Sequence, residues 1–119
     1  MATQTRQTTD QHQMEECIRR CLECLKDCEQ CATECIDVAS KEMARCVKLC
    51  LDCAELCRSC ATLCSRDSEF AAGLAGVCAD ACEACAQECE KGDGEIMRRC
   101  AEACRRCAET CRQMAQMAA

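Results

Sequence analysis

The cysteines of this chain recur every three or four residues in four separate blocks, with other helix-forming residues between them. The alternating steps average about 3.5 residues, the period of a buried seam on helices that pack at shallow angles. β-Strands need a period of two, so the pattern excludes them. The blocks are Cys17, Cys21, Cys24, Cys28, Cys31 and Cys35; Cys46, Cys50, Cys53, Cys57, Cys60 and Cys64; Cys78, Cys82, Cys85 and Cys89; and Cys100, Cys104, Cys107 and Cys111.

Good helix formers, mainly Glu, Lys, Arg, Ala and Leu, separate the cysteines inside each block. The blocks themselves are separated by short polar or glycine-containing segments, which end helices. Short connections make consecutive helices antiparallel, so we predict an all-α, up-down-up-down four-helix bundle with a cysteine-lined core. The predicted helices span about 10–38, 41–64, 68–91 and 94–117.

The first nine residues differ from the rest of the chain. Residues 1–9 are rich in Thr and Gln and contain nothing to bury, so we expect a disordered tail before a bundle of residues 10–119. They also lack the apolar run of a signal peptide. No apolar run approaches the roughly 20 residues that span a membrane. We therefore expect a cytoplasmic chain without membrane contact.

Composition makes the seam unusual, because 20 of the 119 residues are cysteine and there is no proline. Small secreted proteins with this much cysteine are usually loop-rich disulfide scaffolds, whereas a helical chain that stays in the cytoplasm keeps its thiols reduced. Cysteine also behaves as a small core hydrophobe. Leucine at the same positions would bury more apolar area, so stability alone does not explain cysteine on all four helices. The pattern favours metal binding.

Thiolate is a soft ligand, which selects copper(I), zinc or iron–sulfur clusters. Cysteines four residues apart lie one helical turn apart, which suits a metal held by two ligands. A monovalent ion matched with thiolates leaves little net charge in the core, whereas each zinc held by four thiolates leaves a net charge of about −2. We therefore predict that all twenty cysteines bind several copper(I) ions. A broader thiolate buffer for zinc or cadmium and a redox or disulfide-based structural module remain as alternatives.

Other classes of function fit poorly. The net charge of −6 and the pI near 4.8 leave no basic stripe for a nucleic acid. No nucleophile–base pair or carboxylate dyad stands out, so we do not expect an enzyme. The single histidine, His12, lies outside the cysteine pattern and is expected on the surface.

Four methionines continue the seam beyond the cysteine blocks: Met14, Met43, Met97 and Met114. In an antiparallel bundle Met43 and Met97 share one end, and we predict that copper(I) enters there, because neutral thioethers bind it weakly and can pass it inward. At the opposite end we expect Phe70 and Leu74 to form a hydrophobic plug. The alternative is that the methionines only fill gaps in the core.

These features together resemble the bacterial copper storage proteins, which are cysteine-lined four-helix bundles. The resemblance extends from about residue 14 to residue 117 and is most specific over 69–72, 78–91 and 100–109. It implies a homotetramer of bundles, each holding many copper(I) ions through its inward cysteines. Because it lacks an export signal, the chain is similar to the cytosolic members of the family. For those members, long-term storage or detoxification is the expected role.

One segment departs from that family's pattern. Relatives often carry histidines in the connection before the fourth helix, whereas residues 92–97 here contain none. A histidine-based uptake step is therefore in doubt for this chain, and Met97 is the candidate substitute.

Overall fold

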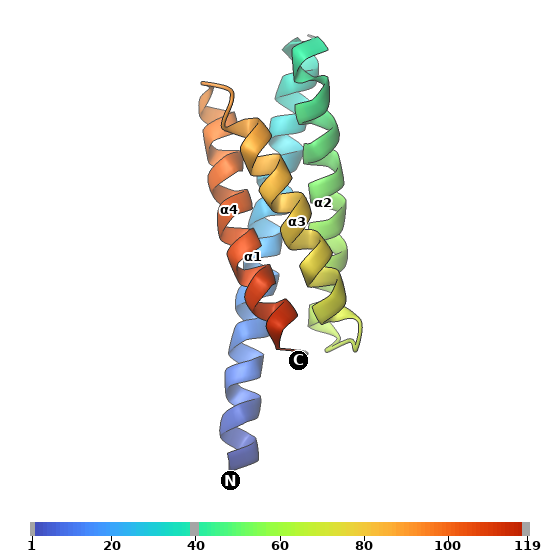
Figure 1. Ribbon diagram of the computed structural model, residues 1–119, viewed down its shortest axis with the longest axis vertical. Coiled ribbons are helices and arrows are strands. Elements are labelled where there is room, and N and C mark those ends of the chain that lie inside the picture. Colours follow the sequence, from blue (N-terminus) through green and yellow to red (C-terminus); the bar gives the residue numbers. More distant parts are fainter. Residues whose placement is uncertain (1, 39–40, 118–119) are drawn as a thin grey trace.

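The computed structural model describes the backbone of residues 2–38 and 41–117 and the side chains of 10–37 and 41–117. Four helices lie side by side in a rod of 57 × 21 × 19 Å (Figure 1). No strand occurs in the described ranges, so the predicted all-α four-helix bundle is confirmed. The elements are α1 (Ala2–Val38), the 3-10 helix η1 (Lys41–Met43), α2 (Ala44–Ser65), α3 (Ala71–Cys89) and α4 (Glu95–Gln116).

Sulfur contacts between helices follow an antiparallel order, in which residue numbers rise along one helix as they fall along its neighbour. Between α2 and α3, Cys46 Sγ lies 3.8 Å from Cys89 Sγ, and Cys57 Sγ lies 3.8 Å from Cys78 Sγ. The same order relates α1 to α2 and to α4, through Cys35–Cys46 at 3.9 Å, Cys24–Cys53 at 3.7 Å, Cys28–Cys100 at 3.7 Å and Cys17–Cys111 at 3.9 Å.

A tight turn ends α2 and reverses the chain into α3. Asp67 has a φ of 55°, in the left-handed region that Asp tolerates better than most residues. Its N–H donates to the Cys64 carbonyl at 3.1 Å, and the Ser68 N–H donates to the Leu63 carbonyl at 3.0 Å. These two bonds form a Schellman motif, which satisfies carbonyls that the end of α2 leaves open.

The observed ends of α3 and α4 lie slightly inside the predicted ones. Because the turn after α2 occupies residues 66–70, α3 begins at Ala71 rather than 68, and it ends at Cys89 rather than 91. Gly94 has an extended backbone, with φ −80° and ψ 151°, so α4 begins one residue later than predicted. These shifts leave every cysteine of the last two blocks inside a helix.

The N-terminal residues differ from the prediction. Helix α1 begins at Ala2, so residues 2–9 are helical here, where the sequence predicted a disordered tail. Neither glycine nor proline interrupts this stretch, and the helical hydrogen bonds of α1 continue through it. Figure 1 shows that these first turns project beyond the other three helices.

Small side chains flank the cysteine seam and explain how so few aliphatic residues build a core. Each helix places alanine one position beyond seam cysteines, and these alanines are no more than 5% exposed. Their methyl groups let neighbouring helices approach closely, so cysteine sulfurs from different helices touch. The alanines are Ala32, Ala54, Ala61, Ala79, Ala86, Ala101 and Ala108.

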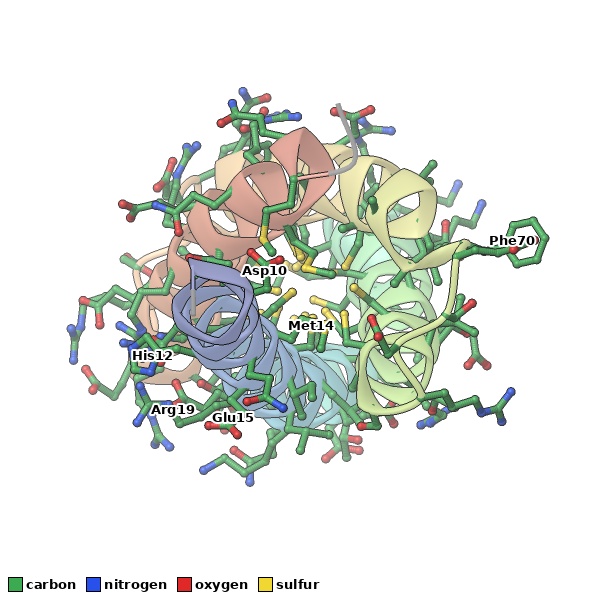
Figure 2. The ribbon with its side chains drawn as sticks, turned by 90° about the horizontal axis from the view of Figure 1, so that it is seen from below. Asp10, His12, Met14, Glu15, Arg19 and Phe70 are labelled. Atoms are coloured by element: carbon green, nitrogen blue, oxygen red, sulfur yellow. The ribbon has the colours of Figure 1, made fainter. Side chains whose placement is uncertain are left out.

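The hydrophobic plug predicted near the α2–α3 turn is not formed as expected. Phe70 is 69% exposed and points away from the bundle (Figure 2). Leu74 is partly buried against the core. Phe70 immediately precedes α3, and the direction of the α2–α3 turn aims its side chain outward. The aromatic ring therefore does not cover this end of the core.

Charged side chains cover the outside of the bundle. Arg112 bridges α4 to α3 through Asp80 at 3.0 Å and Glu83 at 2.9 Å, and Arg105 reaches Glu90 at 2.8 Å. Exposed pairs of this kind contribute little stability each, about 0–1 kcal/mol. In the described part of the chain, none of the helices combines the length and apolar character needed to cross a membrane.

Candidate metal centre

The interior of the bundle is a column of thiols. All twenty cysteines are free and buried, and none is more than 3% exposed. Viewed along the axis, their sulfurs gather in the middle of the four helices (Figure 2). The 3.5-residue period of each block accounts for this placement, because it keeps every cysteine on the inward stripe of its helix.

Sulfurs one helical turn apart touch, as the four-residue spacing predicts. The Sγ atoms of Cys24 and Cys28 are 3.8 Å apart, and those of Cys107 and Cys111 are also 3.8 Å apart. Contacts between helices are as short, for example 3.5 Å between Cys53 and Cys82. A small rotamer change suffices to place two such sulfurs on one soft metal ion.

The thiols also form groups of four whose sulfurs all lie within 4.8 Å of one another. Consecutive quartets share members: the first and second share Cys21, the second and third share Cys57, the third and fourth share Cys24 and Cys53, and the fourth and fifth share Cys28. The column is therefore continuous along the axis. Five quartets, in axial order, are Cys17/Cys21/Cys60/Cys111, Cys21/Cys57/Cys78/Cys107, Cys24/Cys53/Cys57/Cys82, Cys24/Cys28/Cys53/Cys104 and Cys28/Cys50/Cys85/Cys100.

Quartet geometry alone does not choose the metal. Sulfurs about 3.8 Å apart form the edges of a tetrahedron that suits zinc, whose bonds to sulfur are about 2.3 Å long. Copper(I) and zinc differ in the net negative charge that they leave on the thiolates. Among the described residues, no buried Lys or Arg balances such a charge. One monovalent ion per thiolate leaves the filled column close to neutral, whereas one divalent ion per four thiolates leaves about two negative charges.

Without metal, most of the thiols, among them Cys35 and Cys28, hold their protons more tightly than a free thiol does. Burial and the neighbouring Cys46 sulfur raise the pKa of Cys35 to about 11. The pKa of Cys28 is also raised, because its sulfur is hydrogen-bonded to the sulfurs of Cys100 and Cys104 and because the site is buried. A metal ion must therefore displace protons as it binds, since the thiolate and not the thiol is the ligand.

One buried polar residue was not singled out from the sequence. Asp27 is only 7% exposed, and its Oδ1 has no hydrogen-bond partner among the described residues. Burial raises the pKa of this carboxyl, and the nearby sulfurs of Cys100 and Cys24 raise it further. The available signal was its position directly before Cys28, where an acidic side chain flanks the seam.

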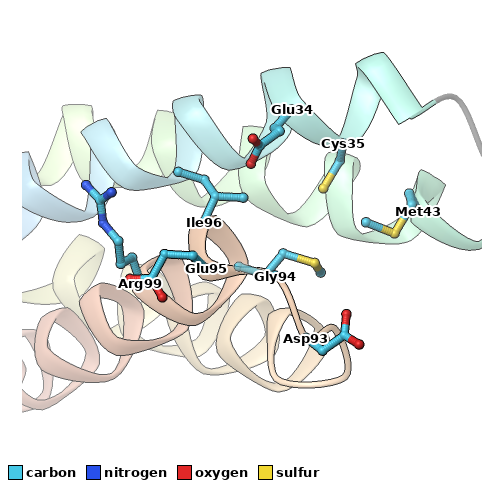
Figure 3. Close-up of a pocket in the computed structure, with 9 residues that line it drawn as sticks. Glu34, Cys35, Met43, Asp93, Gly94, Glu95, Ile96 and Arg99 are labelled. Atoms are coloured by element: carbon cyan, nitrogen blue, oxygen red, sulfur yellow. The ribbon is translucent and has the colours of Figure 1, made fainter.

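The methionines lie where the seam pattern places them. Met97 and Met114 are 7% and 6% exposed, and Met14 and Met43 pack half-buried against the cysteine core. Met43 and Met97 line one cavity of about 550 Å³ together with Cys35 (Figure 3). His12 is exposed and points away from the sulfurs (Figure 2).

The backbone at Gly92 packs closely against Met97. A Cβ atom at position 92 would lie 2.2 Å from Met97 Sδ and 2.6 Å from its Cε. Only glycine lets the thioether lie against the backbone at this point. The glycine in the connection before α4 therefore helps to set where the Met97 sulfur sits in the cavity.

Comparison with known proteins gave consistent matches. The Bacillus subtilis copper storage protein 3, in its apo form, is 40% identical, with a TM-score of 0.79, over 85% of this chain and 97% of its own. A structure described as Cu(I)-bound copper storage protein BsCsp3 is 38% identical, with a TM-score of 0.82, over 87% of this chain and 98% of its own. A cytosolic copper storage protein from Streptomyces lividans, with five coppers, is 33% identical, with a TM-score of 0.85, over 92% of this chain and 97% of its own.

A search of curated proteins found no match. A sequence profile described as "copper storage protein", in contrast, matches residues 10–116, nearly the whole bundle. Together with the solved relatives and the thiol column, this match shows that the chain belongs to the copper storage protein family.

Proposed function

We propose that this chain stores copper(I) in the cytoplasm and holds many ions through the thiolates of all twenty cysteines. The observation that carries the proposal is the continuous column of overlapping thiol quartets. A single structural metal would need one quartet and leave the others unexplained. Relatives that carry copper, one of them described as cytosolic, support the same assignment. We expect no catalytic activity.

The choice of copper(I) over zinc or cadmium rests on charge. A divalent ion in an isolated quartet of thiolates leaves about two negative charges, and burying each uncompensated charge costs several kcal/mol. The described core contains Asp27 but no Lys or Arg to balance such charges. A buffer for zinc or cadmium is the second candidate, favoured only by the tetrahedral spacing of the quartets.

Titration of the reduced apo-protein under anaerobic conditions tests the function. With copper(I) supplied against a competing chelator, we expect about 10 ions per chain if each takes two thiolates, rising toward about 20 if thiolates bridge. Zinc supplied in the same way should fill far fewer sites. Binding of only one or two copper(I) ions, or equal capacity for both metals, would contradict the proposal.

We also propose that copper(I) enters beside Met43 and Met97. The cavity there combines two thioethers with Cys35, so an ion can pass from neutral ligands to a thiol of the column. Met43→Leu with Met97→Leu should slow uptake and leave capacity unchanged, because leucine preserves volume and the thiols are untouched. Stopped-flow loading from a copper(I) donor gives the rate. An unchanged rate would reduce both methionines to packing residues.

The assembly that we propose is a homotetramer, without nucleic acid or a membrane as partners. Several large apolar side chains are about half exposed on the outside of the bundle, including Leu22, Ile36, Leu51 and Val77. In a tetramer, contacts between chains would cover these exposed apolar side chains. Sedimentation equilibrium should give about four times the chain mass of 13.1 kDa, and a monomer at micromolar concentration would contradict this assembly.

A further inference from the structure

The opposite end of the bundle, where a hydrophobic plug was predicted, contains a cavity of about 630 Å³. Three methionines and three carboxylates line it, and the rest of its wall is polar apart from Ala72. Figure 2 looks into this end: Asp10 and Met14 lie on the inner side of α1, whereas Phe70 points outward. The six residues are Met14, Met114, Met117, Asp10, Asp67 and Glu69.

Two of these methionines connect the cavity to the thiol column. Met14 precedes Cys17 by one helical turn on α1, and Met114 follows Cys111 by one turn on α4. Cys17 and Cys111 are themselves in contact, with 3.9 Å between their sulfurs, and both belong to the first quartet. The thioethers therefore lie between the cavity and the outermost thiols.

Two small residues of α3 and one hydrogen bond between α1 and α4 lie at the Met14 end of the bundle. On α3 the seam continues with buried Ala71 and Ala75, which occupy positions where the other blocks carry sulfur. Gln13 donates a hydrogen bond of 2.9 Å to Gln113, which fixes α1 against α4 at the same level.

The charge of the cavity favours cations. No Lys or Arg is among its described lining residues, and Asp10, Asp67 and Glu69 take part in no ion pair with any other described side chain. A concave site lined by one sign of charge raises the local concentration of the opposite ion and its association rate. The carboxylates attract the copper(I) ion by their charge. Because they bind it only weakly, the ion moves on to the softer thioethers.

We propose that this cavity is a second copper(I) port, at which Met14, Met114 and Met117 capture the ion and pass it to Cys17 and Cys111. The proposal rests on the storage function proposed above. Because thioethers are neutral and bind more weakly than thiolates, they exchange the ion quickly and do not hold it at equilibrium. The store then fills from both ends.

Uptake rates of three variants test the proposal. Met14→Leu with Met114→Leu and Met117→Leu closes the new port, and Met43→Leu with Met97→Leu closes the first. Each of these two variants should slow initial uptake by about two-fold if the ports contribute equally. The third variant carries all five substitutions and should slow uptake by more than about ten-fold. Stopped-flow loading from a copper(I) chelate, at equal protein concentration, supplies the three rates.

Capacity measured on the same samples separates two kinds of failure. The triple variant could show full capacity and a wild-type rate, and the variant with all five substitutions could be no slower than Met43→Leu with Met97→Leu. That result would overturn the second port and leave the storage function intact. A wild-type capacity of one or two ions would overturn the storage function itself. Thermal unfolding of each apo-variant shows that the leucines preserve the fold.

Neutralising the carboxylates supplies a second readout that packing cannot explain. Asp10→Asn, Asp67→Asn and Glu69→Gln should slow uptake, and the difference from wild type should vanish at about 1 M salt, where charges are screened within about 3 Å. Asparagine preserves the left-handed backbone at position 67. The matched control neutralises Glu15, Asp52 and Glu109, which lie outside both cavities. Equal slowing by the control set would contradict a role for this cavity.

Discussion

The two ends of the bundle use the same kinds of side chain in a different order. At the Met43 end, Cys35 lines the cavity directly, beside Met43 and Met97. At the Met14 end, no cysteine is among the described lining residues, and methionines stand between the cavity and the first thiols. A thiol is therefore within reach of an arriving ion at one end, whereas carboxylates and thioethers come first at the other.

This difference changes the chemistry of the first step. The pKa of Cys35 is raised to about 11, so near pH 7 this thiol is neutral and must lose its proton to bind copper(I). A thioether carries no proton and needs no ionisation. The two ends therefore differ in whether the first ligand that an ion meets must lose a proton, although the thiols behind both ends must lose theirs.

The largest expected effect is on the pH dependence of uptake. With the Met14 end closed by Met14→Leu, Met114→Leu and Met117→Leu, initial uptake should rise by up to about ten-fold per pH unit between pH 6 and 9, as the Cys35 thiolate fraction does. Stopped-flow loading across this range measures the slope.

The matched variant closes the Met43 end through Cys35→Ser, Met43→Leu and Met97→Leu. Its slope should be clearly shallower, because capture at thioethers needs no proton release. Identical slopes in the two variants would mean that the order of ligands at the ends has no kinetic consequence.

A smaller effect concerns the stability of the apo-protein at high pH. The folded pKa of Cys35, about 11, lies above its ordinary value of 9.0. The thiol therefore contributes stability that is fully present below pH 9 and is lost as the pH rises through 11. The pKa of Cys64, at the other end, is raised as well, through its contacts with Cys17 and Cys60 and through burial.

Both ends should thus weaken in the same direction. Between pH 9 and 11 we expect the melting temperature of the reduced apo-protein to fall by more than about 10 °C, since many thiols add to the effect. Circular dichroism under reductant gives the curve, and copper-loaded protein is the control, because its thiolates have no proton left to lose. A flat melting temperature across this window would show that the folded thiols ionise as freely as unfolded ones.

The smallest expected effect is on the uptake rate when the Met97 sulfur is displaced but not removed. Gly92→Ala introduces a Cβ within 2.2 Å of Met97 Sδ, so the flexible thioether must move. The φ of Gly92 is not positive, and alanine should change stability by no more than about 1 kcal/mol. Uptake should slow by less than about two-fold when the Met14 end is closed. Gly73→Ala, where no atom lies within 4 Å, is the control.

Much of the site could be predicted from spacing alone. A 3.5-residue period places the cysteines on one face of each helix, and that face is buried in a bundle. The burial of residues as distant in sequence as Cys17 and Cys111 could therefore be predicted from their spacing. The seam also placed Met14 and Met114 one turn further out. These features depend only on helix periodicity, which the sequence states directly.

The features that were missed depend on the geometry of single turns and on packing. Phe70 was expected to cover one end, but the left-handed backbone at Asp67 sets the course of the turn, and no periodicity applies there. Asp27 is buried near Cys100 and Arg99 of α4, and a two-letter pattern of polar and apolar residues does not encode this packing between helices. The helical residues 2–9 likewise carry no repeat that marks them.

If the quartets hold copper as we propose, their shared cysteines would set the order in which the stored ions leave. An ion that passes from one quartet to the next can keep a bond to the shared Cys21, Cys57 or Cys28 while it exchanges its other ligands. It moves without ever being released into the core, and it reaches the middle only by way of the quartets nearer an end. With one open end, the last ion stored would be the first withdrawn. With both ends open, as we propose, an ion stored early could leave at one end while another enters at the opposite end.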